Sequence, residues 1–200
     1  IYPDTPTETI LNLVQSRTDC AGLVLLFGSD RMDREQLEAL GRLPMRVVAV
    51  DSMFFYSDFL PDNVYVLSPD GADCAEKMAE VLVRRGHRRI VYAKTAYDTP
   101  DCHARLRAYR DAHASAGLPV DEELIYCKPL REIDTPELVE TFLDDVLPLR
   151  PDALLLGNPT TIGFCLKQLR KRGLAVPGDL SIVGMDDWPT AEAFTPEIAA

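Results

Sequence analysis

Residues 150–189, with the sequence RPDALLLGNPTTIGFCLKQLRKRGLAVPGDLSIVGMDDWP, decide the fold class of this 200-residue chain. Residues 153–156 form an apolar run too short for a helix, and residues 181–184 form a second one. Between them, Asn158-Pro159 offers a capping side chain followed by a proline at the first helical position. Apolar residues then recur at helical spacing, at Ile162, Cys165, Leu166 and Leu169. The stretch therefore predicts strand, helix and strand, with polar residues after each strand.

The polar residues that follow the two predicted strands include Asn158 and Asp186. Open α/β sheets bind their ligands beyond the carboxyl ends of the strands. We therefore expect Asn158 and Asp186 to face the same crevice.

The rest of the chain repeats this alternation. Further strands are predicted at residues 22–27, 47–50, 63–67, 89–93 and 124–127, and helices at 33–41, 70–85, 101–116 and 135–146. A capping box at residues 5–8 also predicts a helix near the start, with Ile10, Leu13 and Val14 on its apolar face. Strands that alternate with helices indicate parallel sheets with right-handed crossovers. Seven strands are expected, with a boundary between two lobes near Ser68.

Composition restricts the classes of function. The chain is 46% hydrophobic with a net charge of −11, which argues against this segment itself gripping phosphate backbones. No apolar run reaches membrane-spanning length. Five scattered cysteines without a C-x-x-C pair favour reduced thiols in the cytosol. The histidines lack metal-ligand spacing, so we expect no metal and no cofactor.

The one dense basic run is RRGHRR at residues 84–89. Cations at a helix C-terminus interact favourably with the helix dipole, and this is the favoured interpretation. A nucleic-acid contact patch is the weaker alternative.

Three blocks resemble the lactose-repressor (LacI/GalR) family of bacterial transcription regulators: D-G---A--M---L---GHRRI from residue 70 to 90, PDALLLGN, and G-LAVPGDLSIVGMDD. The resemblance implies two Rossmann-like α/β lobes with parallel sheets, a periplasmic-binding-protein-like type I fold, with an effector bound between them. Residues 1–67 and 187–200 would form the N-terminal lobe, and residues 68–186 the C-terminal lobe. The family's DNA-binding headpiece, its opening strand-helix-strand and the stretch after Glu197 have no counterpart here. We therefore expect a fragment whose first lobe is incomplete.

The resemblance also implies a set of ligand-binding residues. Asp51, Arg105, Asn158 and Asp186 match family positions that hold the hydroxyls of a bound effector. Carboxylates accept hydroxyl protons, whereas guanidinium and amide groups donate, so this mixture suits a polyol. Each has a structural alternative, because Asp51 could cap a turn, Arg105 could be a solvated helix residue and Asn158 is a good helix cap.

Aromatic residues could stack on a sugar face, and the candidates are Phe54, Tyr56, Tyr97 and Trp188. Of these, we predict Phe54 and Trp188 as ligand-binding residues. An aromatic in such a loop is as often a packing residue. The sequence contains no G-x-S-x-G, P-loop, G-x-G-x-x-G or H-E-x-x-H motif. Asp186-Asp187 has no third carboxylate placed by motif to complete a Mg²⁺ site. We therefore expect no enzyme activity.

The sequence thus predicts the ligand-sensing domain of a cytoplasmic LacI/GalR-type regulator that binds a small polyhydroxylated effector, which we expect to be a sugar. Its expected partners are a second copy, in a homodimer, and operator DNA through a headpiece absent from this chain, with no membrane partner. One alternative is a secreted sugar-binding protein of a transporter with the same fold, and another is an α/β enzyme. Five cysteines without an evident pairing pattern and the GHRRI block favour the regulator.

Overall fold

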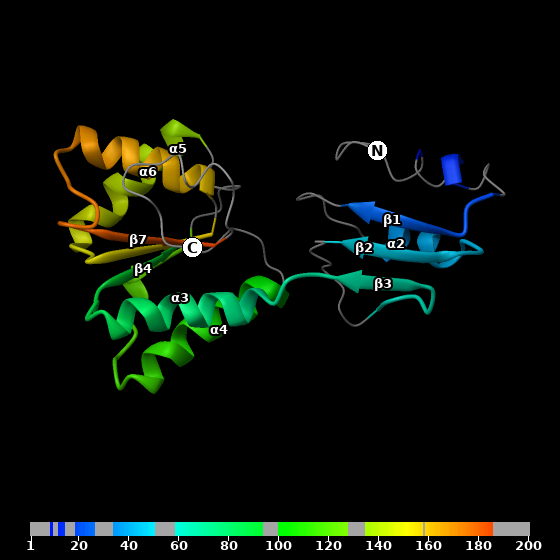
Figure 1. Cartoon of the computed structure of the whole chain (residues 1–200), viewed down its shortest axis with the longest axis horizontal. Coiled ribbons are helices and arrows are strands. Elements are labelled where there is room, and N and C mark those ends of the chain that lie inside the picture. Colours follow the sequence, from blue (N-terminus) through cyan, green and yellow to red (C-terminus); the bar gives the residue numbers. More distant parts are fainter. Residues whose placement is uncertain are drawn as a thin grey trace. The chain divides into compact units, whose positions relative to one another are not determined.

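The computed structural model describes residues 9, 12–14, 19–26, 34–50, 59–93, 100–127, 135–157 and 159–185. The chain divides into two compact units. The first is built from Ile1–Asp70 and Asp98–Asp101, and the second from Gly71–Tyr97 and Cys102–Ala200. Each unit is an α/β layer structure with its own sheet (Figure 1). The predicted lobe assignment of residues 187–200 concerns residues outside the described part and stays a prediction.

The first unit is a parallel sheet of three strands in the order β1-β2-β3. Its elements are β1 (Gly22–Leu26), α2 (Arg34–Gly41), β2 (Arg46–Val50) and β3 (Val64–Leu67). One sheet face packs on α2 through a cluster of Val14, Leu25, Leu37, Leu40, Leu43, Val47 and Val64. The expectation that Leu13 is buried beside Val14 is wrong, because Leu13 is 48% exposed and Val14 only 7%.

The second unit is a parallel sheet of four strands in the order β5-β4-β6-β7. In chain order its elements are α3 (Gly71–Arg84), β4 (Ile90–Ala93), α4 (Pro100–Ser115), η1 (Glu122–Leu124), β5 (Ile125–Tyr126), α5 (Pro136–Val146), η2 (Leu147–Leu149), β6 (Ala153–Leu156), α6 (Pro159–Lys171) and β7 (Ser181–Gly184). Helices α3 and α4 cover one face and α5 and α6 the other (Figure 1). The fold class predicted from the sequence is confirmed.

The central strands of this sheet are apolar at every position because both faces are covered. All four residues of β6 are fully buried or nearly so. Ala153 and Leu155 pack with the residues of α3 and α4, whereas Leu154 and Leu156 pack with those of α5 and α6. Strand β6 thus joins two hydrophobic layers, and this packing on both faces fixes the position of its carboxyl end.

Local capping residues explain where several elements begin. Thr135 caps α5 as predicted, with its Oγ1 accepting from the Leu138 amide at 3.3 Å. The strand predicted at residues 124–127 is shorter than expected, because Leu124 belongs to η1. The cause is Asp121, whose Oδ1 accepts from the Glu123 amide at 3.2 Å and stabilises this 3₁₀ turn. The side chain therefore overrides the apolar pattern at the start of β5.

Candidate functional site

The candidate site lies at the carboxyl edge of the second unit's sheet. Strands β6 and β7 run in register to their ends, where Leu156 pairs with Gly184. Beyond this pair the Met185 amide still donates to the Leu156 carbonyl oxygen at 3.0 Å. In the sequence, Asn158 lies two residues after Leu156, and Asp186 lies two residues after Gly184. Both lie outside the described residues. The two strands that lead to the predicted ligand residues therefore end at the same level of the sheet.

Helix α4 is held against the sheet by Tyr109. The Tyr109 hydroxyl donates to the carbonyl oxygen of Ile90 at 2.9 Å, and its ring stacks on Tyr92 with centroids 5.1 Å apart. The side chain is 1% exposed, and this burial raises the pKa of Tyr109 well above its usual range. Tyr109 therefore stays a neutral donor that fixes the rotation of α4 about its axis.

Arg105 lies one helical turn before Tyr109, so the two side chains leave α4 on the same face. The arginine is partly buried, and its Nη1 donates to the Sδ of Met185 at 3.0 Å. Met185 is 7% exposed and immediately precedes Asp186. The guanidinium thus reaches the end of β7, next in sequence to a predicted ligand residue.

Of the six predicted ligand residues, Arg105 is the one that the structure describes. The other five, Asp51, Phe54, Asn158, Asp186 and Trp188, lie outside the described residues and stay predictions. Sequence reasoning missed Met185 and Tyr109. Tyr109 could have been found from its spacing of four residues from Arg105, whereas Met185 is 80 residues away and carried no such signal.

The Arg105 side chain suits hydrogen bonding to a polar ligand. A guanidinium has five N–H donors in a planar fork and keeps its charge at all ordinary pH values. Among the residues that the structure describes, no group of three or more His, Cys, Asp or Glu side chains could hold a metal ion. The described part of the chain also contains no helix that is long and apolar enough to cross a membrane.

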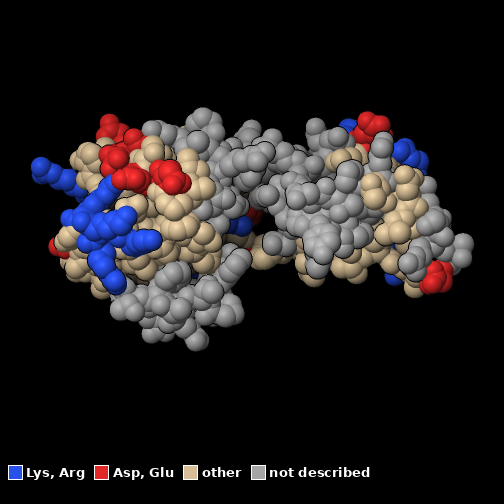
Figure 2. All heavy atoms as spheres, turned by 90° about the horizontal axis from the view of Figure 1, so that it is seen from above, with Lys and Arg blue, Asp and Glu red and all other residues tan. Residues whose placement is uncertain are grey.

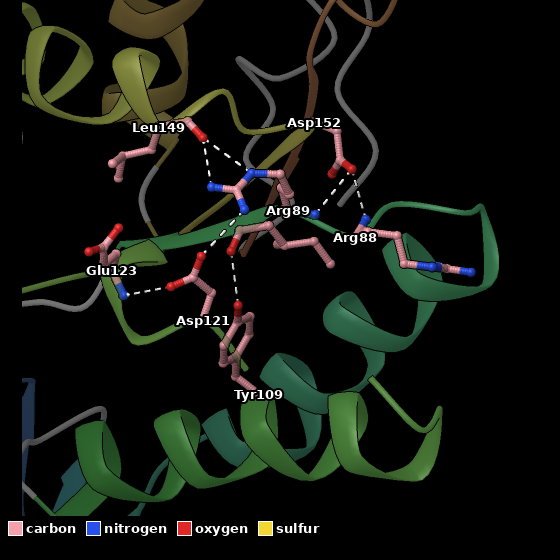
Figure 3. A network of polar contacts seen from close by, with 8 residues as sticks. Arg88, Arg89, Tyr109, Asp121, Glu123, Leu149 and Asp152 are labelled. Carbon is pink, nitrogen blue, oxygen red and sulfur yellow. Dashed lines mark hydrogen bonds and ion pairs between the residues drawn. The ribbon is translucent and has the colours of Figure 1, made fainter. Parts of the chain in front are cut away.

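The opposite, amino-terminal edge of the same sheet carries the GHRRI block, and its arginines serve structural roles (Figure 3). The backbone amides of Arg88 and Arg89 donate to Asp152 Oδ2 at 2.8 and 3.1 Å. The Nε and Nη2 of Arg89 donate to the Leu149 carbonyl oxygen at 3.2 and 2.8 Å, and its Nη1 lies 3.4 Å from Asp121 Oδ2. These contacts join the start of β4 to the segments before β5 and β6.

The favoured interpretation of this basic run, cations at a helix end, fits Arg84, in the last turn of α3, and Arg88, but not Arg89. Arg88 Nη1 donates to the carbonyl oxygen of Val83, in the last turn of α3. Lysine and arginine side chains also gather at one end of the second unit (Figure 2). Arg170 and Lys171, both exposed, lie in the last turn of α6. Cations at these positions interact favourably with helix dipoles.

Cys165, a buried cysteine of this unit, is a packing residue. Cys165 is fully buried in the cluster between the sheet and α5–α6, and burial raises the pKa of its thiol to about 12. The thiol therefore stays protonated and unreactive at neutral pH.

Residues 79–200, more than half of the chain, match the family described as the periplasmic binding protein-like domain. The chain belongs to this family. The HTH-type transcriptional repressor PurR of Vibrio campbellii is 28% identical over 193 residues. The alignment covers 96% of this chain and 54% of PurR, so the chain spans about half the length of this relative.

Solved structures agree with the assignment. A regulatory protein of the LacI family from Chloroflexus aggregans superposes with a TM-score of 0.76 at 26% identity, covering 96% of this chain and 65% of that one. A complex of the transcriptional regulator CelR with cellobiose gives a TM-score of 0.76 at 24% identity, covering 96% and 56% of the two chains, and shows the shared fold. The resemblance to LacI/GalR effector-binding domains that the sequence predicts is confirmed.

Proposed function

We propose that this LacI/GalR-type domain binds a small polyhydroxylated effector, a sugar, at the carboxyl edge of the second unit's sheet. The observation that supports the proposal is the placement of Arg105. Its guanidinium reaches the end of β7, where it contacts Met185 Sδ at 3.0 Å. Asp51, Asn158 and Asp186 complete the proposed polar set, and Phe54 and Trp188 are the proposed aromatic contacts.

A sugar suits these groups for a chemical reason. Each sugar hydroxyl both donates and accepts a hydrogen bond, so a site that binds several of them needs donors and acceptors together. Arginine and the asparagine amide donate, and the aspartates accept. A charge-assisted hydrogen bond contributes about 1.5–3 kcal/mol, so two or three such bonds give a sugar its affinity and orientation.

The relatives support the same class of ligand and a regulatory role. The CelR structure contains cellobiose, and PurR is a transcriptional repressor. We infer that the whole protein is a cytoplasmic, non-enzymatic homodimer that binds operator DNA through a separate headpiece. Operator half-sites mirror the two-fold symmetry of a dimer. The effector would shift the regulator between two conformations by its differential affinity for them. No relative named above is a transport protein, so that alternative is not favoured.

A thermal-shift screen of monosaccharides and disaccharides, with cellobiose among them, tests the proposal. A ligand that binds only the folded state adds about 2.7 kcal/mol of stability at one hundred times its Kd. We expect at least one sugar to raise the melting temperature with a saturating concentration dependence, while glycerol at equal concentration does not. A flat response to every sugar, with the protein folded, would contradict the proposal.

A further inference from the structure

Met185 is a buried methionine at the point where β7 leaves the sheet. Its amide donates to the Leu156 carbonyl oxygen at 3.0 Å, which extends the β6–β7 ladder by one step. Its side chain packs in the same buried cluster as Tyr92, Tyr109 and Val183. Both the backbone and the side chain of Met185 are therefore fixed by the sheet and by the α4 side of the core.

The sulfur of Met185 is directed at Arg105. The Nη1 of Arg105 donates to it at 3.0 Å, so a residue of α4 is joined to the end of β7 across 80 residues of sequence. Arginine has many rotamers, and a ligand that must restrict them loses affinity for that reason. A thioether is a weak acceptor, and the contact engages one of the five N–H donors of the guanidinium. The contact can therefore restrict the rotamers of Arg105 through a single N–H group.

We propose that Met185 is a positioning residue that orients the Arg105 guanidinium at the carboxyl edge before the effector arrives. The proposal rests on the proposed function of Arg105 as an effector contact. Leucine in place of Met185 would conserve most of the buried volume and remove the acceptor. This substitution therefore separates the effect of the sulfur from that of the side-chain bulk.

The first test needs no ligand. The side-chain Nε–H signal of Arg105, identified by its loss in Arg105→Lys, reports rotation of the guanidinium in a ¹⁵N NMR exchange measurement. We expect Met185→Leu to accelerate this rotation about fivefold, which corresponds to about 1 kcal/mol at 1.4 kcal/mol per decade. Met78→Leu is the matched control, because Met78 is 8% exposed in the same cluster. Equal rotation rates in the wild type and Met185→Leu would overturn the proposal.

Protein in which norleucine replaces methionine gives the same answer if Met185→Leu does not fold. Norleucine keeps the length of the side chain and replaces sulfur by a methylene group. Faster rotation of Arg105 in this protein supports the proposal, and an unchanged rate overturns it.

The second test measures cellobiose binding by calorimetry. We expect Met185→Leu to weaken binding about fivefold relative to Met78→Leu, with melting temperatures that agree between the two variants. Equal affinity in both variants would overturn the positioning role while leaving the sugar site intact. If the wild type gives no heat with cellobiose, the choice of sugar is wrong, and the rotation measurement alone decides the role of Met185.

Discussion

Gly184, at the end of β7, lies directly against the side chain of Ile162 in the first turns of α6. A Cβ atom built on Gly184 would overlap the Cδ1 atom of Ile162, which is 1% exposed. In the sequence, Asn158 immediately precedes α6 and Asp186 follows Gly184 by two residues, and both are predicted ligand residues. The absence of a side chain at Gly184 therefore sets the spacing of the elements that lead into the candidate site.

Gly184→Ala should lower the free energy of unfolding by about 1–3 kcal/mol, the usual cost of overpacking a core. The same substitution should cost much less in an Ile162→Val background, because valine lacks Cδ1. Denaturant unfolding of the single and double variants measures the coupling. Gly157→Ala is the control, since a Cβ there meets no atom within 4 Å. Equal costs of Gly184→Ala in both backgrounds would show that the contact does not matter.

Asn63→Asp should destabilise the first unit by about 3 kcal/mol. A buried polar group left without its hydrogen-bond partner costs about 1–3 kcal/mol, and a charged group lies at the top of this range or above it. The Asn63 Nδ2 donates to the carbonyl oxygens of Leu40, Leu43 and Met45 at 3.2, 3.2 and 3.0 Å. A carboxylate cannot donate and would face the same oxygens with a negative charge. Hydrogen exchange of the β2 amides measures the loss.

Asp62→Asn is the matched control for this prediction, because Asp62 is exposed and adjacent. It should leave the exchange rates of the β2 amides unchanged. Protection of β2 that is equal in Asn63→Asp and the wild type would contradict the role given to the amide.

The fold could be predicted from the sequence because its signals are local. Apolar runs of four or five residues, the cap at Thr135 and the glycine at position 173, which has a φ of 74°, each mark an element boundary within a few residues. Contacts between distant segments carried no such signal. Arg89 bonds to Leu149 and Asp121, which are 60 and 32 residues away, so its role differed from that of a helix-terminal cation.

The same contrast between local signals and long-range contacts holds for the candidate site. Arg105 was predicted through the family resemblance, since three arginines lie within six residues of this helix and no local pattern separates them. The rotation of α4 is set by the bond from Tyr109 to Ile90, and that rotation turns Arg105 toward the sheet. Its contact with Met185 follows from tertiary packing and could not be predicted from either segment alone.

Deprotonation of the Tyr126 phenol should destabilise the folded protein in alkaline solution. Burial, reinforced by the hydrogen bond from its hydroxyl to Asp145 Oδ2 at 3.1 Å, raises the pKa of Tyr126 to about 12 from a usual value near 10. The neutral phenol is favoured in the folded state, so its stabilising contribution is complete below pH 10 and decreases as the pH rises toward 12. The free energy of unfolding, measured with urea, should therefore fall more steeply with pH in the wild type than in Tyr126→Phe between pH 10 and 12. Parallel curves would contradict the prediction.

Residues 1–200 alone should not bind duplex DNA with sequence selectivity. The net charge of −11 opposes contact with phosphates, and Arg84 and Arg110 form ion pairs with Glu80 and Glu122. A gel-shift assay at physiological salt, with an unrelated duplex as competitor, checks this. A selective shift by this chain would contradict it.

Calorimetric titration of Arg105→Ala with the sugar that most raises the melting temperature tests the central claim most directly. Loss of a charge-assisted hydrogen bond of about 1.5–3 kcal/mol should raise the Kd by about one to two decades. Arg107→Ala, an exposed arginine two residues along α4, should bind as the wild type does. The melting temperatures of both variants should stay close to that of the wild type. A Kd for Arg105→Ala equal to that of Arg107→Ala, with both variants folded, would contradict the placement of the effector site at this edge of the sheet.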